Sequence, residues 1–456
     1  MNSMARPAAV GSPGESDNSL RTRTTDLLVY ATGSIGMGVW ITVPGLLLLY
    51  FLTRTLGVSP LLAGLTLVLP KIVDVLIHPL FGYLSDRQAR RAGHRRGMLR
   101  AGLPLGLAML AMFTVPQGFS GPSAALWVGG WLVTGNLLFA AFQVPYLTTP
   151  SDLPVGYHER TRVFMFRMLM LTVGLLGAGA AAPALVHAGG RADYARMALI
   201  LAVVMIAAGV IGLAGVRRLT ERRGFRVQAE VSHAGLGDLR NTLRDSSFRA
   251  LVLSYLLTGT TTHLFLAAVP FYTEYVVRDK DLTAILVAGF LSPALFAGPG
   301  WMWLSRRIGK QRGLLLAQGI FIAGSLALLP GSAATPAVSV AIVAVLGIAF
   351  AGLQLLAFAM VPDAVAAAET RGSARAGSYT GVWTATDAFG SALGPYAYSA
   401  VLTLGGFVSA TEGHAAAQSD TARTAILLGF TVLPTLLMVL AFLFQRRCAL
   451  DAGATE

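Results

Sequence analysis

Three ionisable residues lie within one short stretch, KIVDVLIHP, and their spacing suits the binding of a cation or a proton. Lys71, Asp74 and His78 are three and four residues apart, so a helix places all three side chains on one face. In this arrangement Asp74 supplies the anion and Lys71 a tethered countercharge. The alternative for this pair is structural, an Asp–Lys contact that locks helices together. His78 could relay protons, because imidazole changes charge near neutral pH, or it could be a neutral hydrogen-bonding residue between helices.

Asp387 is a second carboxylate, and it stands far from any basic residue in the stretch TGVWTATDAFGSALGP. A buried charge without a partner is expensive, so we expect Asp387 to face a central cavity near Arg167 or Lys71. The alternative is a protonated, structural aspartic acid. Gln143, near the end of another apolar block, suits either a ligand or a neighbouring helix as its hydrogen-bonding partner.

Aromatic residues could line the same cavity, and charged residues could guard its mouth. Tyr146, Trp383, Trp131 and Tyr379 are candidates for the lining, although aromatic residues of membrane helices more often pack or anchor at the interface. Charged residues follow three of the apolar blocks, and we interpret them as gate or loop-anchoring ion pairs, with Asp86 paired to Arg87. These residues are Asp86, Arg87, Asp152, Glu159, Arg160 and Asp363.

The composition shows what kind of elements must position these residues. Of the 456 residues, 54% are hydrophobic and only 12% are charged, whereas a soluble protein carries about a quarter charged residues. The apolar residues form long blocks, and a helix of about 20 residues crosses a bilayer core of roughly 30 Å. A membrane-spanning barrel would instead alternate apolar and polar residues. The chain is therefore predicted to be an all-α membrane protein.

Twelve blocks are long enough to be membrane spans. We place them at residues 26–52, 59–85, 99–117, 124–149, 163–188, 197–216, 248–277, 283–304, 313–331, 335–362, 376–405 and 424–445. Of the 35 Lys and Arg residues, only six fall in the loops of one side: Arg54, Arg191, Arg196, Arg278, Lys280 and Arg423. Because basic loops remain in the cytoplasm, this bias predicts a multi-pass protein of the cytoplasmic (inner) membrane with both termini cytoplasmic.

The same bias explains the net charge of +13 as topology and not as nucleic-acid binding. The predicted organisation is a cytoplasmic tail (1–25), a six-helix bundle (26–217), a basic linker (218–246), a second six-helix bundle (247–445) and a cytoplasmic tail (446–456). A weak repeat, GYLSDRQARRAGHRR after the second span and GWMWLSRRIGKQR after the eighth, fits two parallel halves.

The sequence gives no sign of an enzyme. There is no Walker loop and no HExxH motif, the seven histidines are scattered, and Cys448 is the single cysteine, which excludes an internal disulfide framework. We therefore expect no catalytic activity, no cofactor and no metal site. The expected partners are a small-molecule substrate, a coupling cation and the lipid bilayer, with the chain acting as a monomer.

Four segments resemble the glycoside–pentoside–hexuronide:cation symporter family, a branch of the major facilitator superfamily that includes the melibiose carriers. They are KIVDVLIHPLFGYLSDR, FQVPYLTTPSDLPVGYHERTRVFMFR, MVPDAVAAAETRGSARAGSYTGVWT and the basic middle loop. The resemblance spans nearly the whole chain and implies the major facilitator fold, with twelve helices in two six-helix bundles. It places Lys71 at the family's second-helix Arg, Asp74 at its first cation-binding Asp and Arg167 at its fifth-helix Arg.

The chain departs from this family pattern at four positions. His78, Gln143 and Asp387 replace an Asp, an acidic residue and a Lys, and Gly38 stands where melibiose-type carriers place a sugar-binding Asp. Because a hard cation such as Na⁺ prefers several oxygen ligands, the resemblance and these changes favour H⁺ over Na⁺ as the coupling ion.

We therefore expect a secondary active transporter, a proton-coupled symporter of a small organic solute that the resemblance suggests is a sugar or glycoside. The alternatives are a lipid or amphiphile carrier of the same fold and a membrane sensor that does not transport. A cavity that opens sideways to lipid and lacks sugar-type polar groups would favour the amphiphile carrier.

Overall fold

A computed structural model describes residues 22–186, 189–226, 244–333, 335–369, 376–411 and 416–448. Helices dominate these residues, and the only β pairing among them is an isolated bridge between Leu56 and Thr411. The tails at 1–21 and 449–456 and most of the predicted linker, 227–243, lie outside the described residues.

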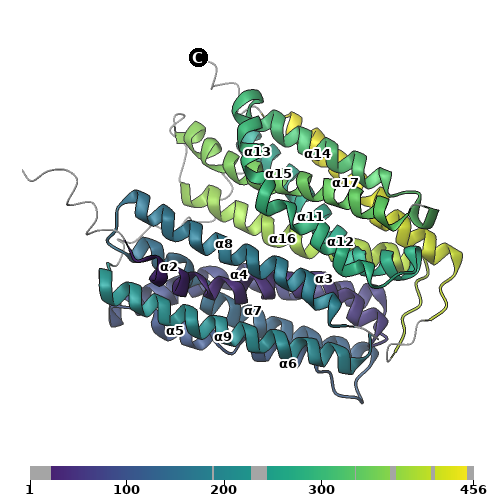
Figure 1. Ribbon diagram of the computed structural model, residues 1–456, viewed down its shortest axis with the longest axis horizontal. Helices are drawn as coiled ribbons and strands as arrows, with labels where there is room; N and C mark the ends of the chain where they lie inside the picture. Colours follow the sequence, from purple (N-terminus) through teal and green to yellow (C-terminus); the bar gives the residue numbers. More distant parts are fainter. Residues whose placement is uncertain are drawn as a thin grey trace, which may run out of the picture.

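Within the described residues, the helices form twelve crossings of the molecule when interrupted helices are counted once. The first six are α2 (Thr24–Ala31) with α3 (Gly33–Arg54), α4 (Pro60–Ala92), α5 (Arg96–Gly102) with α6 (Leu105–Phe113), α7 (Gly121–Asp152), α8 (Tyr157–Ala184) and α9 (Arg191–Arg223). The last six are α11 (Ser246–Phe271) with the π-helical turn η1 (Tyr272–Val277), α12 (Leu282–Leu291) with α13 (Pro293–Ile308), α14 (Lys310–Ala327), α15 (Pro336–Glu369), α16 (Ala376–Leu404) and α17 (Asp420–Arg446). Figure 1 shows the two halves as separate bundles, purple to teal and green to yellow. The twelve-helix prediction is confirmed.

Nine helical spans of the described residues are long and apolar enough to cross a membrane by themselves. The other three crossings have local reasons to fall short. Pro104 separates α5 from α6, α14 begins with the polar residues Lys310, Gln311 and Arg312, and α16 carries Asp387 among many Gly, Ser and Thr residues. The first of these crossings falls short because it is interrupted, and the other two because polar residues lower their hydropathy.

Several helices continue beyond the spans predicted from hydropathy. The helix α9 covers Arg191–Arg223 and α4 reaches Ala92, past the predicted ends at 216 and 85. Ion pairs between successive turns stabilise the polar extension of α9, where Arg217 Nε lies 2.9 Å from Glu221 Oε1. Hydropathy marks only the part of a helix that lies in hydrocarbon. The helix itself ends where its terminal backbone groups find other hydrogen-bonding partners.

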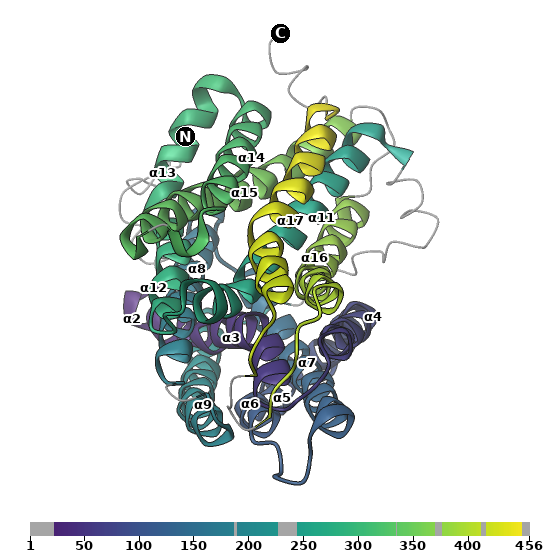
Figure 2. The same cartoon turned by 90° about the vertical axis from the view of Figure 1, so that its right-hand side faces the viewer.

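The ends of the bundles differ in charge, and we name them accordingly. The basic end holds the last turns of α4, α9, α13 and α17, each with arginines, and the opposite end holds the last turns of α3 and α16. The bundles contact each other mainly through α4 with α16, α8 with α12 and α3 with α11. Figure 2, a view at 90° to Figure 1, shows α4 beside α16.

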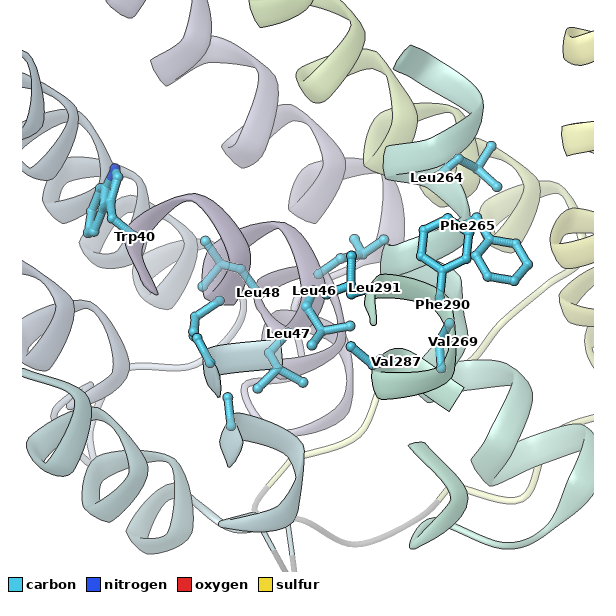
Figure 3. Close-up of a cluster of buried hydrophobic side chains, with 14 of the residues drawn as sticks. Trp40, Leu46, Leu47, Leu48, Leu264, Phe265, Val269, Val287, Phe290 and Leu291 are labelled. Atoms are coloured by element: carbon cyan, nitrogen blue, oxygen red, sulfur yellow. The ribbon is translucent and has the colours of Figure 1, made fainter. Parts of the chain in front are cut away.

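Contacts between the bundles are tightest toward the opposite end. At Gly64, near the start of α4, an added Cβ would lie 2.0 Å from Ser399 Oγ of α16, so only glycine permits this approach. One apolar cluster continues from α3 into α11 and α12, and Figure 3 shows Leu46 and Leu47 of α3 facing Val287 and Leu291 of α12. This packing leaves the space between the bundles in the half nearer the basic end.

Candidate functional site

A cavity of about 480 Å³ lies between the bundles, and five helices supply its walls. The N-terminal bundle contributes the middle of α3, α4 and α7, and the C-terminal bundle contributes α11 and the first half of α16. Most of the lining is apolar, including Trp40, Leu132 and Phe139, with polar groups on both sides. A mostly apolar cavity with a few converging polar groups is the usual form of a small-molecule site.

On the N-terminal wall, the three residues singled out by their spacing form one network with Gln143. Lys71 Nζ lies 3.4 Å from Asp74 Oδ2, and His78 Nδ1 lies 3.2 Å from Asp74 Oδ1. His78 Nε2 lies 3.3 Å from Gln143 Oε1 of α7. Asp74 is 7% exposed, whereas the side chains of Lys71 and His78 are about one-third exposed. All four residues line the cavity.

The two ring nitrogens of His78 show what this network can do chemically. Nδ1 also lies 2.9 Å from the backbone carbonyl of Asp74, and Nε2 faces the side-chain oxygen of Gln143. The donor and acceptor roles of the two nitrogens depend on the tautomer, and a protonated imidazole could donate to both oxygens. Asp74 therefore lies between two side chains that can be cationic, and a proton added to this carboxylate would weaken both attractions.

The C-terminal wall carries the second carboxylate. Asp387 lines the cavity, and its Oδ1 accepts a hydrogen bond of 2.7 Å from the Tyr255 hydroxyl of α11. We find no ion pair of Asp387 within the described part of the chain, so the expected pairing with Lys71 or Arg167 is not observed there. A phenol of the same bundle takes the place of the expected cation.

Sequence reasoning missed four further polar residues of the cavity, of which Thr384 and Ser391 lie on α16. His263 of α11 lines it, with Nδ1 2.9 Å from the Gly259 carbonyl, and Asn136 of α7 lines it as well. Both fall inside predicted spans, and polar residues inside spans are themselves a signal of function.

Three residues expected in the cavity lie elsewhere. Arg167 is buried inside the N-terminal bundle, with its guanidinium 5.2 Å from the centre of the Phe164 ring. Tyr146 is fully buried and stacks on Tyr30 of α2, and Trp383 is buried against Tyr255 with ring centres 4.0 Å apart. None of the three lines the cavity, because each packs against helices of its own bundle.

The structure also explains the absence of a side chain at position 38. An added Cβ at Gly38 would lie 2.7 Å from the Leu171 carbonyl oxygen and 2.7 Å from the Leu175 nitrogen of α8. Helix α3 packs directly on α8 at this point, as small residues allow in membrane bundles. A sugar-binding carboxylate has no room there in this arrangement.

The four carboxylates among the expected gate residues pair within their own bundles at the basic end. Arg95, between α4 and α5, binds Asp152 at 2.7 Å and Asp86 at 2.6 Å, so Asp86 pairs with Arg95 instead of Arg87. Burial lowers the pKa of the Arg95 guanidinium, but these two carboxylates together hold that pKa above its usual value.

The remaining gate residues divide into paired and exposed groups. Glu159 lies 3.2 Å from Arg162 Nη1, and Asp363 lies 2.6 Å from Lys310 Nζ in the C-terminal bundle. Arg87 and Arg160 are exposed. These contacts anchor turns and helix ends within each bundle.

At the opposite end, a buried ion pair that sequence reasoning missed joins the two bundles. Arg54 Nε at the end of α3 lies 3.1 Å from Glu274 Oε1 in η1, and the two side chains are 3% and 7% exposed. Tyr50 donates a hydrogen bond to the other oxygen of Glu274, and Lys280 Nζ lies 2.9 Å from Oε1. Both charged residues fall at span ends in the sequence, where charges are ordinary.

Backbone contacts reinforce this junction. The loop after α16 lies along the loop after α3, with Gly57 N 2.8 Å from the Ala410 oxygen and Ala410 N 2.9 Å from the Thr53 oxygen. Ser409 Oγ donates to the Val58 oxygen at 2.7 Å. The opposite end of the interface is therefore closed, and the cavity lies on the basic side of this closure.

The described residues contain no group of three or more His, Cys, Asp or Glu side chains that could hold a metal ion.

Two bundles of six helices around a central cavity with buried charges on its walls define the class of this protein: it has the fold of the major facilitator transporters.

Comparison with known proteins agrees with this fold and gives the family. Residues 29–452 match the MFS/sugar transport protein family. An isoprimeverose transporter of Lactiplantibacillus pentosus is 26% identical over 413 residues, which cover 88% of this chain and 84% of that protein. A putative glycoside/cation symporter of Escherichia coli (strain K12) is 26% identical, with 71% and 70% of the two chains covered.

A sphingosine-1-phosphate transporter of Mus musculus is 25% identical, with coverage of 77% of this chain and 74% of that protein. The crystal structure of the nucleoside transporter NupG superposes with a TM-score of 0.68 at 15% identity, covering 93% of this chain and 99% of the other. The chain belongs to the MFS/sugar transport protein family, and it is a secondary transporter of small organic solutes.

Proposed function

We propose that the protein is a proton-coupled symporter of a sugar or glycoside that works by alternating access. The observation that carries the proposal is the network of Lys71, Asp74, His78 and Gln143 on the wall of the interbundle cavity. Two relatives, an isoprimeverose transporter and a putative glycoside/cation symporter, support the proposed substrate class and the use of a coupling cation.

Asp74 is the proposed coupling carboxylate. When it is ionised, it attracts Lys71 and His78 on its own helix and, through His78, engages Gln143 of α7. When it is protonated, these attractions weaken, and the charge that the α4 wall presents to α16 across the cavity changes. A cation drives transport only through a different affinity for the two conformations, and a carboxylate whose partners differ between conformations provides that difference.

A proton suits this network better than Na⁺. A hard cation prefers several oxygen ligands, whereas Asp74 has an ammonium group at 3.4 Å and an imidazole nitrogen at 3.2 Å as neighbours. The protein is proposed to lie in a bacterial-type inner membrane with its basic end facing the cytoplasm, because basic loops are retained on that side. It is proposed to function as a monomer. The roles of Lys71 and Asp387 as substrate-facing charges belong to the same proposal.

The test is Asp74→Asn in proteoliposomes, with labelled isoprimeverose and related glycosides as substrates. We expect uphill uptake under an inward proton gradient to fall at least tenfold, while exchange of substrate without a gradient continues. Asp420→Asn is the matched control, because that side chain is 98% exposed at the opposite end. Undiminished uphill uptake by Asp74→Asn would rule out the coupling role, and strong stimulation by Na⁺ at fixed pH would rule out the proton.

The cavity also supports a second candidate, an amphiphile carrier. Its walls are largely apolar, with Ile41, Val75 and Leu132 among them, and position 38 has no room for a sugar-binding carboxylate. The similarity to a sphingosine-1-phosphate transporter points in the same direction. Uptake of labelled lysolipids in the same proteoliposomes, in competition with glycosides, decides between the two substrates.

A further inference from the structure

A second hollow lies on the outer surface of the C-terminal bundle, separate from the central cavity. It has a volume of about 650 Å³, and its walls come from α13, α14 and α15. Its lining is apolar, and Phe296, Leu316 and Ile348 in it are 77%, 45% and 44% exposed. Figures 1 and 2 both place α13 and α14 on the side of this bundle away from the N-terminal bundle. In a membrane protein this surface meets lipid.

Toward the basic end, arginines follow the lining residues of this hollow, which we call the groove of α13, α14 and α15. On α13 the lining residues Pro293, Ala297, Gly300 and Leu304 recur every three to four residues, and Arg307 is the next position on the same face. On α14 the lining residue Leu316 is preceded on its face, four residues earlier, by Arg312. Arg306, one residue from Arg307, lies on the other side of α13 by the same geometry.

Both arginines are placed to meet an anion. They are exposed, and we find no ion pair for either within the described part of the chain, whereas the nearby Lys310 is bound to Asp363 at 2.6 Å. The Arg307 guanidinium lies over the Trp303 ring, 4.2 Å from its centre. Tryptophan is enriched at the level of lipid headgroups, so this stack holds Arg307 at the height where phosphates lie.

We propose that the groove of α13, α14 and α15 is a binding site for an anionic phospholipid, with an acyl chain along the apolar walls and the phosphate between Arg307 and Arg312. Apolar surface of this kind takes a hydrocarbon chain, and basic pockets between helices at the cytoplasmic face take anionic headgroups. Guanidinium groups bind phosphate through paired, charge-assisted hydrogen bonds. The charge of the groove's end therefore selects anionic over zwitterionic lipids.

The experiment uses the full-length purified protein and measures phosphatidylglycerol and phosphatidylcholine binding by native mass spectrometry, together with thermal stabilisation in mixed micelles. The wild type is expected to bind phosphatidylglycerol in preference. The double variant Arg307→Gln/Arg312→Gln is expected to lose affinity for phosphatidylglycerol by about 30-fold, with little change for phosphatidylcholine. The loss should shrink at high salt, which screens charge.

The control double variant is Arg218→Gln/Arg306→Gln, which removes the same charge from exposed positions of the basic end outside the groove. It should retain the preference for phosphatidylglycerol. A third variant, Gly300→Phe, fills the groove, since an added Cβ there meets nothing within 4 Å, and it should weaken binding of both lipids while the protein stays folded. Equal affinity of the wild type for both lipids, or equal losses in the two double variants, would overturn the proposal.

Discussion

The two ends of the interface between the bundles are held in different ways. At the opposite end, the ion pair of Arg54 and Glu274 and the hydrogen bonds of Gly57, Ser409 and Ala410 cross from one bundle to the other. At the basic end, the ion pairs of Arg95 with Asp86 and Asp152 stay within one bundle. Similar contacts are therefore expected to have different roles: those that cross the interface hold one end closed, and those within a bundle stabilise that bundle.

This division also fits a rocking motion of two rigid bundles. A carrier that alternates must break the cross-bundle contacts at one end in each cycle, whereas contacts within a bundle persist. The ion pair of Arg54 and Glu274 is buried, so both charges become hydrated when that end opens. This hydration offsets part of the free-energy cost of separating them.

The largest effect is expected from Glu274→Gln. The change leaves Arg54 buried without its carboxylate, and the loss of one partner of a buried pair costs about 3–5 kcal/mol. Because the cost falls on the closed state, the equilibrium should shift by more than about 100-fold toward opening at this end. Spin labels at the exposed positions Gly118 and Asp420, which lie at the opposite end in different bundles, would be farther apart than in the wild type.

Lys280→Gln is the matched control for that change. Lys280 contacts the same carboxylate but is 45% exposed, and an exposed ion pair contributes about 1 kcal/mol or less. Equal shifts for the two variants, or no shift for Glu274→Gln, would contradict the assignment of Arg54 and Glu274 as the closing pair.

Arg95→Gln tests the other side of the comparison. It leaves Asp152, which is 2% exposed, without its guanidinium, and we expect the free energy of unfolding to fall by about 3 kcal/mol. The label distance at the opposite end should stay as in the wild type. Lys310→Gln, which removes a half-exposed pair of the same end, should change the melting temperature far less. A large change in label distance for Arg95→Gln would mean that the basic end also controls conformation.

The smallest effect is expected from Ser409→Ala. The change removes one hydrogen bond across the interface, to the Val58 oxygen, and a hydrogen bond contributes about 1 kcal/mol. The equilibrium should therefore shift about fivefold toward opening, with an unchanged melting temperature. The distance between the same spin labels measures this shift, and a shift as large as that of Glu274→Gln would contradict so small a contribution.

The fold was largely predictable from the sequence, and the reason is local. Long apolar blocks must become helices because lipid cannot satisfy backbone polar groups. The network of Lys71, Asp74 and His78 was also visible, since spacings of three and four residues join side chains on one helix. The helix ends were not, because polar turns such as the end of α9 continue beyond the hydrocarbon.

The partners of single charges were harder to predict, because they come from distant parts of the chain. Asp387 is 132 residues from Tyr255, and Glu274 is 220 residues from Arg54. Arg167, Tyr146 and Trp383 have residue types that suit a cavity, yet the rotation of their helices turns them into their own bundles. Hydropathy carries no information about that rotation.

A membrane bundle of twelve helices follows from the residues alone, because backbone hydrogen bonding and lipid thickness act on each segment separately. The charged face of α4 follows from residue spacing in the same way. The packing of the helices is needed to explain which face of each helix meets the cavity, why position 38 is glycine and which ion pair closes the opposite end. These features depend on close packing between helices, which joins residues that no local pattern relates.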